Sequence, residues 1–438
     1  MEPPVNAPVV RESRRRPDLL TPESPEGLNV VQITTDPNTN NSHIYMESHV
    51  FTPDSRRFVY QRFRRFDPDD HSTTAHDTML CLCDIEDDFS LRQLTDEQGA
   101  KAPSVSPDGK YVYYIVDQTI PGGGKSMLKR LSLDSFERET LLVIDSPLPG
   151  TNYRPSRYYI LSTISSDGKR LAASAFLGDG KIDGAPFGLL VFDLVDCSVR
   201  LVYEHPEFCN MHPQYCRSKD PQASHDIMIQ HNHGSLCDKQ GKNMKLVADD
   251  LGGDIHVIRD DGTNWRDLPW GRDREEHVHG HECWRGEGLS AIGGIWLGPM
   301  DPVQRPIVES LPAPTDETTS HRGRNLPGAR RNLITRNVEN PRFNHFAFDP
   351  SGTMMVADWI RYAAAGRRGE DCRLFIGTLP EGEDSSLKVR YLLHPGCSWS
   401  GHLAHPHPFL SPDGQKAFFN TDMDGNLQIC MVDGYEYP

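Results

Sequence analysis

A short strand, a tight turn built on Asp-Gly and a second strand recur along this chain at wide, regular intervals. The clearest copies are Phe51–Tyr60, Val105–Tyr114, Ile164–Ala172, Phe348–Val356 and Leu410–Phe418. In each copy, β-branched or aromatic residues follow the turn, which is typical of a β-hairpin. The chain is therefore expected to repeat one supersecondary unit.

The spacing of these turns gives the number of units. The turns fall at Ser55, Gly109, Gly168, Gly352 and Gly414, at intervals of 54, 59, 184 and 62 residues. The long interval corresponds to three steps of about 61 residues, and two weaker turns lie inside it, at Asp220-Pro221 and Glu287-Gly288. Seven units share the 438 residues, and about 63 residues each is the size of a four-stranded propeller blade.

Most units continue with a second hairpin, which we expect at Leu82–Thr95, Leu128–Val143, Leu189–Glu204, Ile255–Leu268 and Leu374–Leu393. The final unit has only Leu427–Asp433, so the orphan strand Asn29–Thr34 can complete it and remove an open edge. We predict an all-β, seven-bladed β-propeller over residues 27–438, closed by this N-terminal strand. Residues 1–26 are expected to be a flexible extension. A pair of β-sandwiches would not explain seven evenly spaced turns.

Charge and hydropathy exclude several kinds of partner. The chain has 46 basic and 62 acidic residues, a net charge of −16, which repels a phosphate backbone, so no nucleic acid is expected. No apolar run approaches the ~20 residues needed to cross a bilayer, so no membrane is expected either. Without a recognisable signal peptide, a cytoplasmic location is expected unless a leader has been removed. The ten cysteines are expected to be reduced packing residues.

Histidines occur at one height on three consecutive inner strands. Counting seven residues back from each turn gives His281, His345 and His407, whereas the other four units give Ser48, Ala102, Leu161 and Gln214. With 19 histidines in the chain, a single one is more often a polar core or surface residue. A shared register across three blades instead favours a metal or catalytic cluster.

Two more histidines precede His407. His405 lies two residues earlier, so a strand projects both side chains from one face. His402 stands three before His405, and Gly401 could provide the bend that this odd step needs. Three or four imidazoles can hold a divalent transition metal and leave positions open for a substrate.

At these residues the sequence resembles the oligogalacturonate lyases, seven-bladed propeller enzymes that split short pectin fragments by β-elimination. The resemblance rests on His405–Pro408 followed by Ser411–Gly414, on Asn344-His345 before Phe348–Gly352, on His281–Trp284, and on His212–Tyr215. It implies that His345, His405 and His407 bind manganese and that His281 is the general base. In place of the family's fourth ligand, a glutamine, stands His402, which is either a ligand or a second-layer group. An extra imidazole would shift the preference toward zinc, iron or nickel.

A second departure concerns the substrate. Where the family has a catalytic arginine, this chain has Asp254, which would repel a carboxylate. Arg217, His231 and His233 are candidates to compensate, and an altered substrate is equally consistent. His212 is either substrate-facing or structural. Trp284 either stacks on a sugar or packs between blades.

The expected function is that of a metal-dependent polysaccharide lyase acting on short, anionic, uronate-containing oligosaccharides. In that reaction a neutral histidine near its ordinary pKa suits the removal of a carbon-bound proton. For His281 the alternatives are a further metal ligand or a structural group bonded to Glu282. Two other functions stay open: a metal-dependent propeller enzyme on another sugar or a lactone, and a non-catalytic interaction propeller. The sequence does not indicate an oligomeric state.

Overall fold

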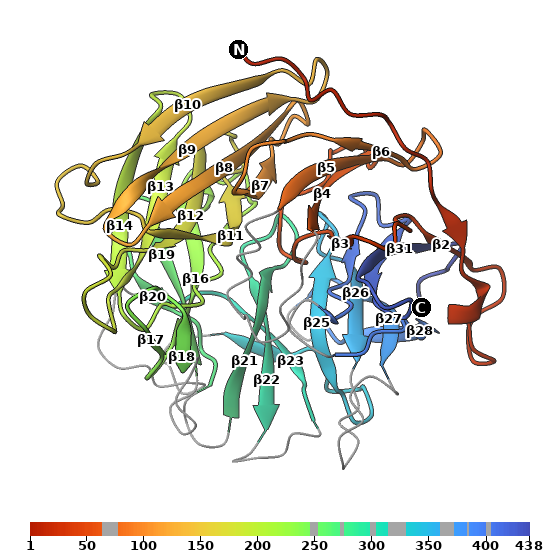
Figure 1. Ribbon diagram of the computed structural model, residues 1–438. Helices are drawn as coiled ribbons and strands as arrows, with labels where there is room; N and C mark the ends of the chain where they lie inside the picture. Colours follow the sequence, from red (N-terminus) through yellow and green to blue (C-terminus); the bar gives the residue numbers. More distant parts are fainter. Residues whose placement is uncertain are drawn as a thin grey trace.

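The computed structural model describes residues 1–63, 78–245, 253–271, 276–297, 304–313, 330–359, 372–382, 385–399 and 404–438. Apart from one small inserted hairpin, its strands form seven antiparallel sheets that follow one another in chain order around a ring (Figure 1). Inner strands of neighbouring sheets contact each other. The prediction of an all-β, seven-bladed propeller is confirmed.

Each of the first six blades has four strands, which follow one another from the axis outward. The first three blades are β3 (Asn40–Ser42), β4 (Arg57–Phe63), β5 (Met79–Asp84) and β6 (Ser90–Gln93); β7 (Ala100–Val105), β8 (Tyr111–Ile120), β9 (Gly123–Ser132) and β10 (Arg138–Ile144); and β11 (Arg157–Ile164), β12 (Arg170–Phe176), β13 (Phe187–Asp193) and β14 (Ser198–His205). The fourth is β15 (Gln214–Tyr215), β16 (Asp226–Asn232), β19 (Gly253–Arg259) and β20 (Arg266–Asp267), with the hairpin β17 (Leu236–Cys237) and β18 (Asn243–Lys245) inserted after β16.

The fifth and sixth blades are β21 (Glu276–Trp284), β22 (Ala291–Leu297), β23 (Ile307–Ser310) and β24 (Arg331–Leu333); and β25 (Phe343–Phe348), β26 (Met354–Trp359), β27 (Arg373–Thr378) and β28 (Lys388–Leu393). The seventh is β29 (Phe409–Leu410), β30 (Ala417–Thr421), β31 (Gln428–Asp433), β2 (Asn29–Gln32) and β1 (Arg14–Arg15). Two short 3-10 helices also occur, η1 (Pro17–Leu19) and η2 (Ala223–His225).

The ring is closed by the N-terminal strand. β2 pairs antiparallel with β31, with Val30 opposite Val432, so these two strands from opposite ends of the sequence lie side by side (Figure 1). This is the strand that the sequence predicted. β1 adds a fifth strand outside it, with Arg15 opposite Val31.

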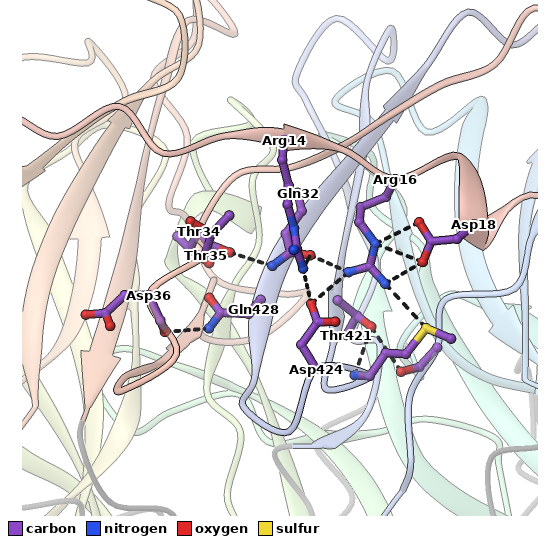
Figure 2. Close-up of polar contacts among 12 residues, drawn as sticks. Arg14, Arg16, Asp18, Gln32, Thr34, Thr35, Asp36, Thr421, Asp424 and Gln428 are labelled. Carbon is purple, nitrogen blue, oxygen red and sulfur yellow. Dashed lines mark hydrogen bonds and ion pairs between the residues drawn. The ribbon is translucent and has the colours of Figure 1, made fainter.

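The extension before β2 contacts the propeller through buried charge (Figure 2). The Arg16 side chain is 5% exposed and pairs with Asp18 at 2.8 Å and with Asp424 at 3.0 Å. It also donates to the Gln32 side chain, which accepts a second hydrogen bond from Arg14. Farther upstream, Glu2 pairs with Lys129 at 2.5 Å. The first residues therefore run along the outer edges of blades before reaching β1. Their predicted flexibility stays a prediction.

A pair of side-chain hydrogen bonds explains why the turn motif recurs. In the turn at Asp108, the carboxylate Oδ1 accepts from the Ser106 hydroxyl at 2.6 Å and from the Lys110 N–H at 3.1 Å. The same pair of contacts recurs at Asp54, Asp167 and Asp413. All seven predicted turns lie between the first and second strands of a blade.

Apolar side chains fill the spaces between neighbouring blades. Between blades one and two, for example, Val59 and Leu80 pack with Val112, Tyr114 and Leu131. None of the ten cysteines, all of which the structure describes, forms a disulfide, and nine of them are buried. Within the described ranges, no helix has the length and apolar character that a membrane crossing requires.

Candidate metal centre and active site

The inner strands become irregular at the height where the histidines lie. Hydrogen-bond register shifts between Val278 and Glu282 in β21 and between Phe343 and Phe346 in β25. A bulge of this kind re-aims the side chains of the unpaired residues. His281 and His345 lie inside these two stretches. His407, just before β29, has a left-handed backbone with φ +43°, a conformation that is costly for a non-glycine residue and is often found at functional sites.

These irregular segments bring three histidines of the predicted metal centre together. One potential ligand atom from each of His345, His405 and His407 lies within 4.8 Å of the other two. His345 and His407 are fully buried, and His405 is partly exposed. Imidazole nitrogens at this spacing fit a divalent transition metal and leave room for further ligands on the His405 side. His402, the fourth predicted ligand, lies outside the described residues.

A carboxylate behind His345 fixes the orientation of its ring. Asp358 on β26 contacts Nδ1 of His345 at 2.6 Å, and its other oxygen accepts from the His345 backbone N–H at 2.8 Å. A neutral His345 that donates from Nδ1 keeps the lone pair of Nε2 for a metal. The amide nitrogen of Asn344 lies 3.2 Å from this Nε2, so a bound metal would replace that contact.

His281 lies against His345, with ring centroids 4.3 Å apart. Its Nδ1 is 2.6 Å from the backbone oxygen of Asn344, and only an N–H can occupy that contact. The proton of neutral His281 is therefore on Nδ1, and Nε2 has the lone pair that a base needs. The side chain of Asn344 in turn accepts from Arg305, whose guanidinium is buried and lies over Trp296.

His212 is buried with two acidic residues. Its Nδ1 is 2.6 Å from Glu47, and its Nε2 is 3.4 Å from the Tyr159 hydroxyl. Burial alone would lower the pKa of His212, but the charge of Glu47 raises it above its ordinary value. Glu282, also buried, is near this pair, and burial raises its pKa to about 8. Both carboxylate oxygens of Glu282 are buried without a hydrogen-bond partner among the described residues, so Glu282 does not orient His281.

Arg217 and Trp284 lie nearer the Asp-Gly turns than His345. Together with Glu47, they line a small cavity. Arg217 is half-buried and donates to the Glu47 backbone oxygen at 3.1 Å. Trp284 is 5% exposed and donates from its indole N–H to the Gln214 backbone oxygen at 2.9 Å. It packs between blades four and five. The described contacts do not join either residue to the three metal-centre histidines.

His231 and His233 belong to a different group, at the end of β16. His231 is 3.0 Å from Glu207, and His233 is 2.6 Å from Asp254. Asp254 is fully buried and contacts an imidazole, so it is not presented to a substrate. The height of the inner-strand histidines does not predict this group, because its members come from the second and third strands of a blade and from connections.

Several residues around the candidate metal centre were also not predicted. Trp399 stacks near His405, with ring centroids 3.9 Å apart, and Tyr45 contacts His407 at 4.9 Å. Asp358 carries a sequence signal, since it is the one acidic residue in the otherwise apolar strand Met354–Trp359. Trp399, Tyr45 and Arg305 lie in connections, where no period marks a side chain that faces the channel.

Comparison with solved structures shows the same fold in known enzymes. An oligogalacturonate lyase in complex with manganese matches with a TM-score of 0.67 and 17% identity, over 100% of this chain and 99% of that one. An oligogalacturonate lyase from Vibrio parahaemolyticus matches with a TM-score of 0.67 and 16% identity, over 99% of both chains. The β-propeller domain of the trilobed protease from Pyrococcus furiosus matches with a TM-score of 0.50 and 10% identity, over 90% of this chain and 96% of that domain.

Sequence comparison adds no further relative. No known family model matches the chain, and no curated protein matches it in sequence. The resemblance to oligogalacturonate lyases is therefore a likeness of fold that extends over the full length of both chains.

Proposed function

We propose that this protein is a metal-dependent lyase that cleaves short uronate-containing oligosaccharides by β-elimination. The observation that carries the proposal is the convergence of His345, His405 and His407, with ligand atoms within 4.8 Å of one another, beside His281. The full-length likeness of fold to oligogalacturonate lyases supports the same class of reaction.

The donor set fits a divalent transition metal. Three imidazoles, one of them oriented by Asp358, form the ligand-plus-carboxylate arrangement that is usual around such ions. A metal held there would supply a Lewis acid that neutralises the substrate carboxylate as charge develops on it. Manganese is the metal that the neighbour structure holds. The all-imidazole donor set of this chain is equally compatible with zinc, iron or nickel.

His281 is proposed as the general base. Because the backbone oxygen of Asn344 holds the proton on Nδ1, Nε2 can accept the proton from C5 of the uronate. The C4–O bond then breaks, a double bond forms between C4 and C5, and the departing sugar oxygen takes a proton from solvent. His281 adjoins His345, so the base and the metal site act on the same sugar residue.

The acidic residue at the position of the family's arginine does not exclude an anionic substrate. Asp254 pairs with His233 and is buried, so it does not repel a uronate. Arg217, His212, His231, His233 and Trp284 stay candidates for substrate binding. Short uronate oligomers are the proposed substrates. A metal-dependent enzyme on another sugar or a lactone is the alternative, and it would leave every uronate in the following experiment unchanged.

The test combines ultraviolet absorbance with metal analysis. Incubated with a panel of uronate oligomers and added Mn²⁺, the protein should produce the absorbance of a C4–C5 double bond. His407→Ala should lose bound metal and activity together. His281→Gln should keep its metal but lower kcat by about 10²- to 10⁴-fold. Absence of the absorbance with every uronate would end the lyase proposal, and loss of metal from His281→Gln would reassign His281 as a ligand.

A further inference from the structure

A second cluster of histidines and carboxylates lies where blades three and four meet. It comprises His205 at the end of β14, Glu207 in the following connection, and His231 near the end of β16. One potential ligand atom from each of the three lies within 4.8 Å of the other two. None of them belongs to the centre formed by His345, His405 and His407.

The carboxylate of this cluster is held in a defined orientation. Oε1 of Glu207 accepts the backbone N–H of Gly234 at 2.9 Å. Its other oxygen, Oε2, lies 3.0 Å from Nε2 of His231 and 3.7 Å from Nδ1 of His233. One oxygen is thus anchored to the backbone while the other faces two imidazoles. Two donor atoms 3.0 Å apart can share one ion at bond lengths of about 2.0–2.2 Å.

The ring of His231 is fixed as well. Phe208 stacks on it, with centroids 4.4 Å apart and planes 24° apart, and the His233 ring lies against it, with centroids 3.8 Å apart. On its far side, His233 contacts Asp254 at 2.6 Å. Packing of the His231 ring on two neighbours limits its movement, as a preorganised metal site requires.

The cluster is also open to solvent. The side chains of His231 and Glu207 are 14% and 31% exposed, so an ion can enter and water can complete its coordination. We propose that His205, Glu207 and His231 bind a second divalent transition metal, of which zinc is the best match. Two imidazoles and one carboxylate are a frequent zinc donor set, and the imidazoles disfavour calcium and magnesium. His233 is a positioning residue beside this site.

Zinc stoichiometry tests the proposal. Untagged protein is stripped with a chelator, saturated with Zn²⁺, freed of excess by gel filtration and analysed for bound zinc. The wild-type chain should carry two zinc ions, and His231→Ala and His407→Ala should carry one each. The double variant should carry none. Titration of His231→Ala should show one site weakened by at least about 100-fold while the other is unchanged.

Two further variants keep the test decisive. Glu207→Gln preserves the side-chain shape and the Gly234 contact, so it reports on ligation even if His231→Ala folds poorly; it should also lose one zinc ion. His225→Ala is the matched control, because His225 also pairs with a carboxylate on blade four, Asp260, at 3.1 Å, yet belongs to neither cluster. It should keep two. A zinc content and affinity that are the same in the wild type and in folded Glu207→Gln would overturn the proposal. A single zinc that persists in His407→Ala but is lost from Glu207→Gln would support it, because that ion occupies the second cluster.

Discussion

At the scale of single residues, Asp358 gives His345 a fixed orientation. The carboxylate contacts the ring at 2.6 Å and the backbone N–H of the same residue at 2.8 Å, and both side chains are fully buried. A histidine held in this way has one tautomer and one ring position available to an ion. The metal affinity of the centre should therefore depend on a residue that does not touch the metal.

Substituting Asp358 tests that dependence. In Asp358→Asn we expect the Mn²⁺ concentration that restores half of the lyase activity to rise about 10- to 100-fold, with little change in kcat at saturating metal. Asp267→Asn is the matched control, because Asp267 contacts His256 at the same 2.6 Å in blade four. An equal rise in both variants would indicate a general loss of structure instead.

A second prediction at the residue scale concerns the effect of Glu282 on the pH dependence of stability. Burial raises its pKa to about 8 from an ordinary 4.5, so the folded chain keeps a proton there that the unfolded chain loses. Between these two values the unfolded state binds fewer protons, and the free energy of unfolding falls as pH rises, by up to about 1.4 kcal/mol per pH unit.

The comparison with Glu282→Gln isolates this effect from other titrations in the channel. Glutamine is neutral at every pH, so the metal-free variant should gain stability over the metal-free wild type as pH rises from 5 to 8. Urea unfolding at several pH values measures the difference. Parallel stability curves for the two proteins would show that Glu282 does not hold its proton.

At the scale of elements, the N-terminal extension is attached through Arg16. This side chain is 5% exposed and contacts Asp18, Asp424 and Gln32, which joins η1 to the edge of blade seven (Figure 2). Because buried charge-assisted hydrogen bonds contribute more than exposed ones, Arg16 should matter more than its neighbour Arg14, which is 49% exposed.

Thermal unfolding of two variants checks this difference. Arg16→Ala should lower the free energy of unfolding by about 1–2 kcal/mol, and Arg14→Ala by less than about 0.5 kcal/mol. Hydrogen exchange of residues 1–26 in the same variants would show whether the extension loosens first. Equal effects of the two substitutions would mean that the extension is held by its backbone pairing alone.

The same scale explains what the sequence could predict. The turns are predictable because the hydrogen bonds to Asp108, and those to the equivalent aspartates, join only residues within five positions of each other. Bulges were not predictable, since a register shift such as that between Val278 and Glu282 depends on the neighbouring strand. Counting back from the turns still places His281 and His345 at one height, because the bulged stretch lies at a similar distance from the turn in both blades.

The sequence places His231 and His233 among the substrate-binding candidates because their partners, Glu207 and Asp254, contact them only in the folded protein.

At the scale of the whole molecule, the proposed metal centre connects two blades. His345 comes from β25 in blade six, whereas His405 and His407 immediately precede β29 in blade seven. An ion bound by all three would bind the folded ring and not the unfolded chain. At 100 times its dissociation constant, such a ligand adds about 2.7 kcal/mol to the free energy of unfolding.

Metal removal therefore gives a prediction for the intact propeller. Adding Mn²⁺ to stripped protein should raise Tm by several degrees, and His407→Ala should abolish the part of the shift that this centre contributes. Differential scanning calorimetry measures both. A Tm shift that is the same in wild type and His407→Ala would place the stabilising ion elsewhere.

Closure of the ring by β2 and β31 also sets an order of events during synthesis. Val30 pairs with Val432, so the strand made early has to wait for a partner translated about 400 residues later. At ribosomal speeds of about 5–20 residues per second, that delay is roughly 20–80 seconds. Until β31 is translated, the edge of β2 that it covers stays unpaired, and chaperones can act on this edge throughout the interval.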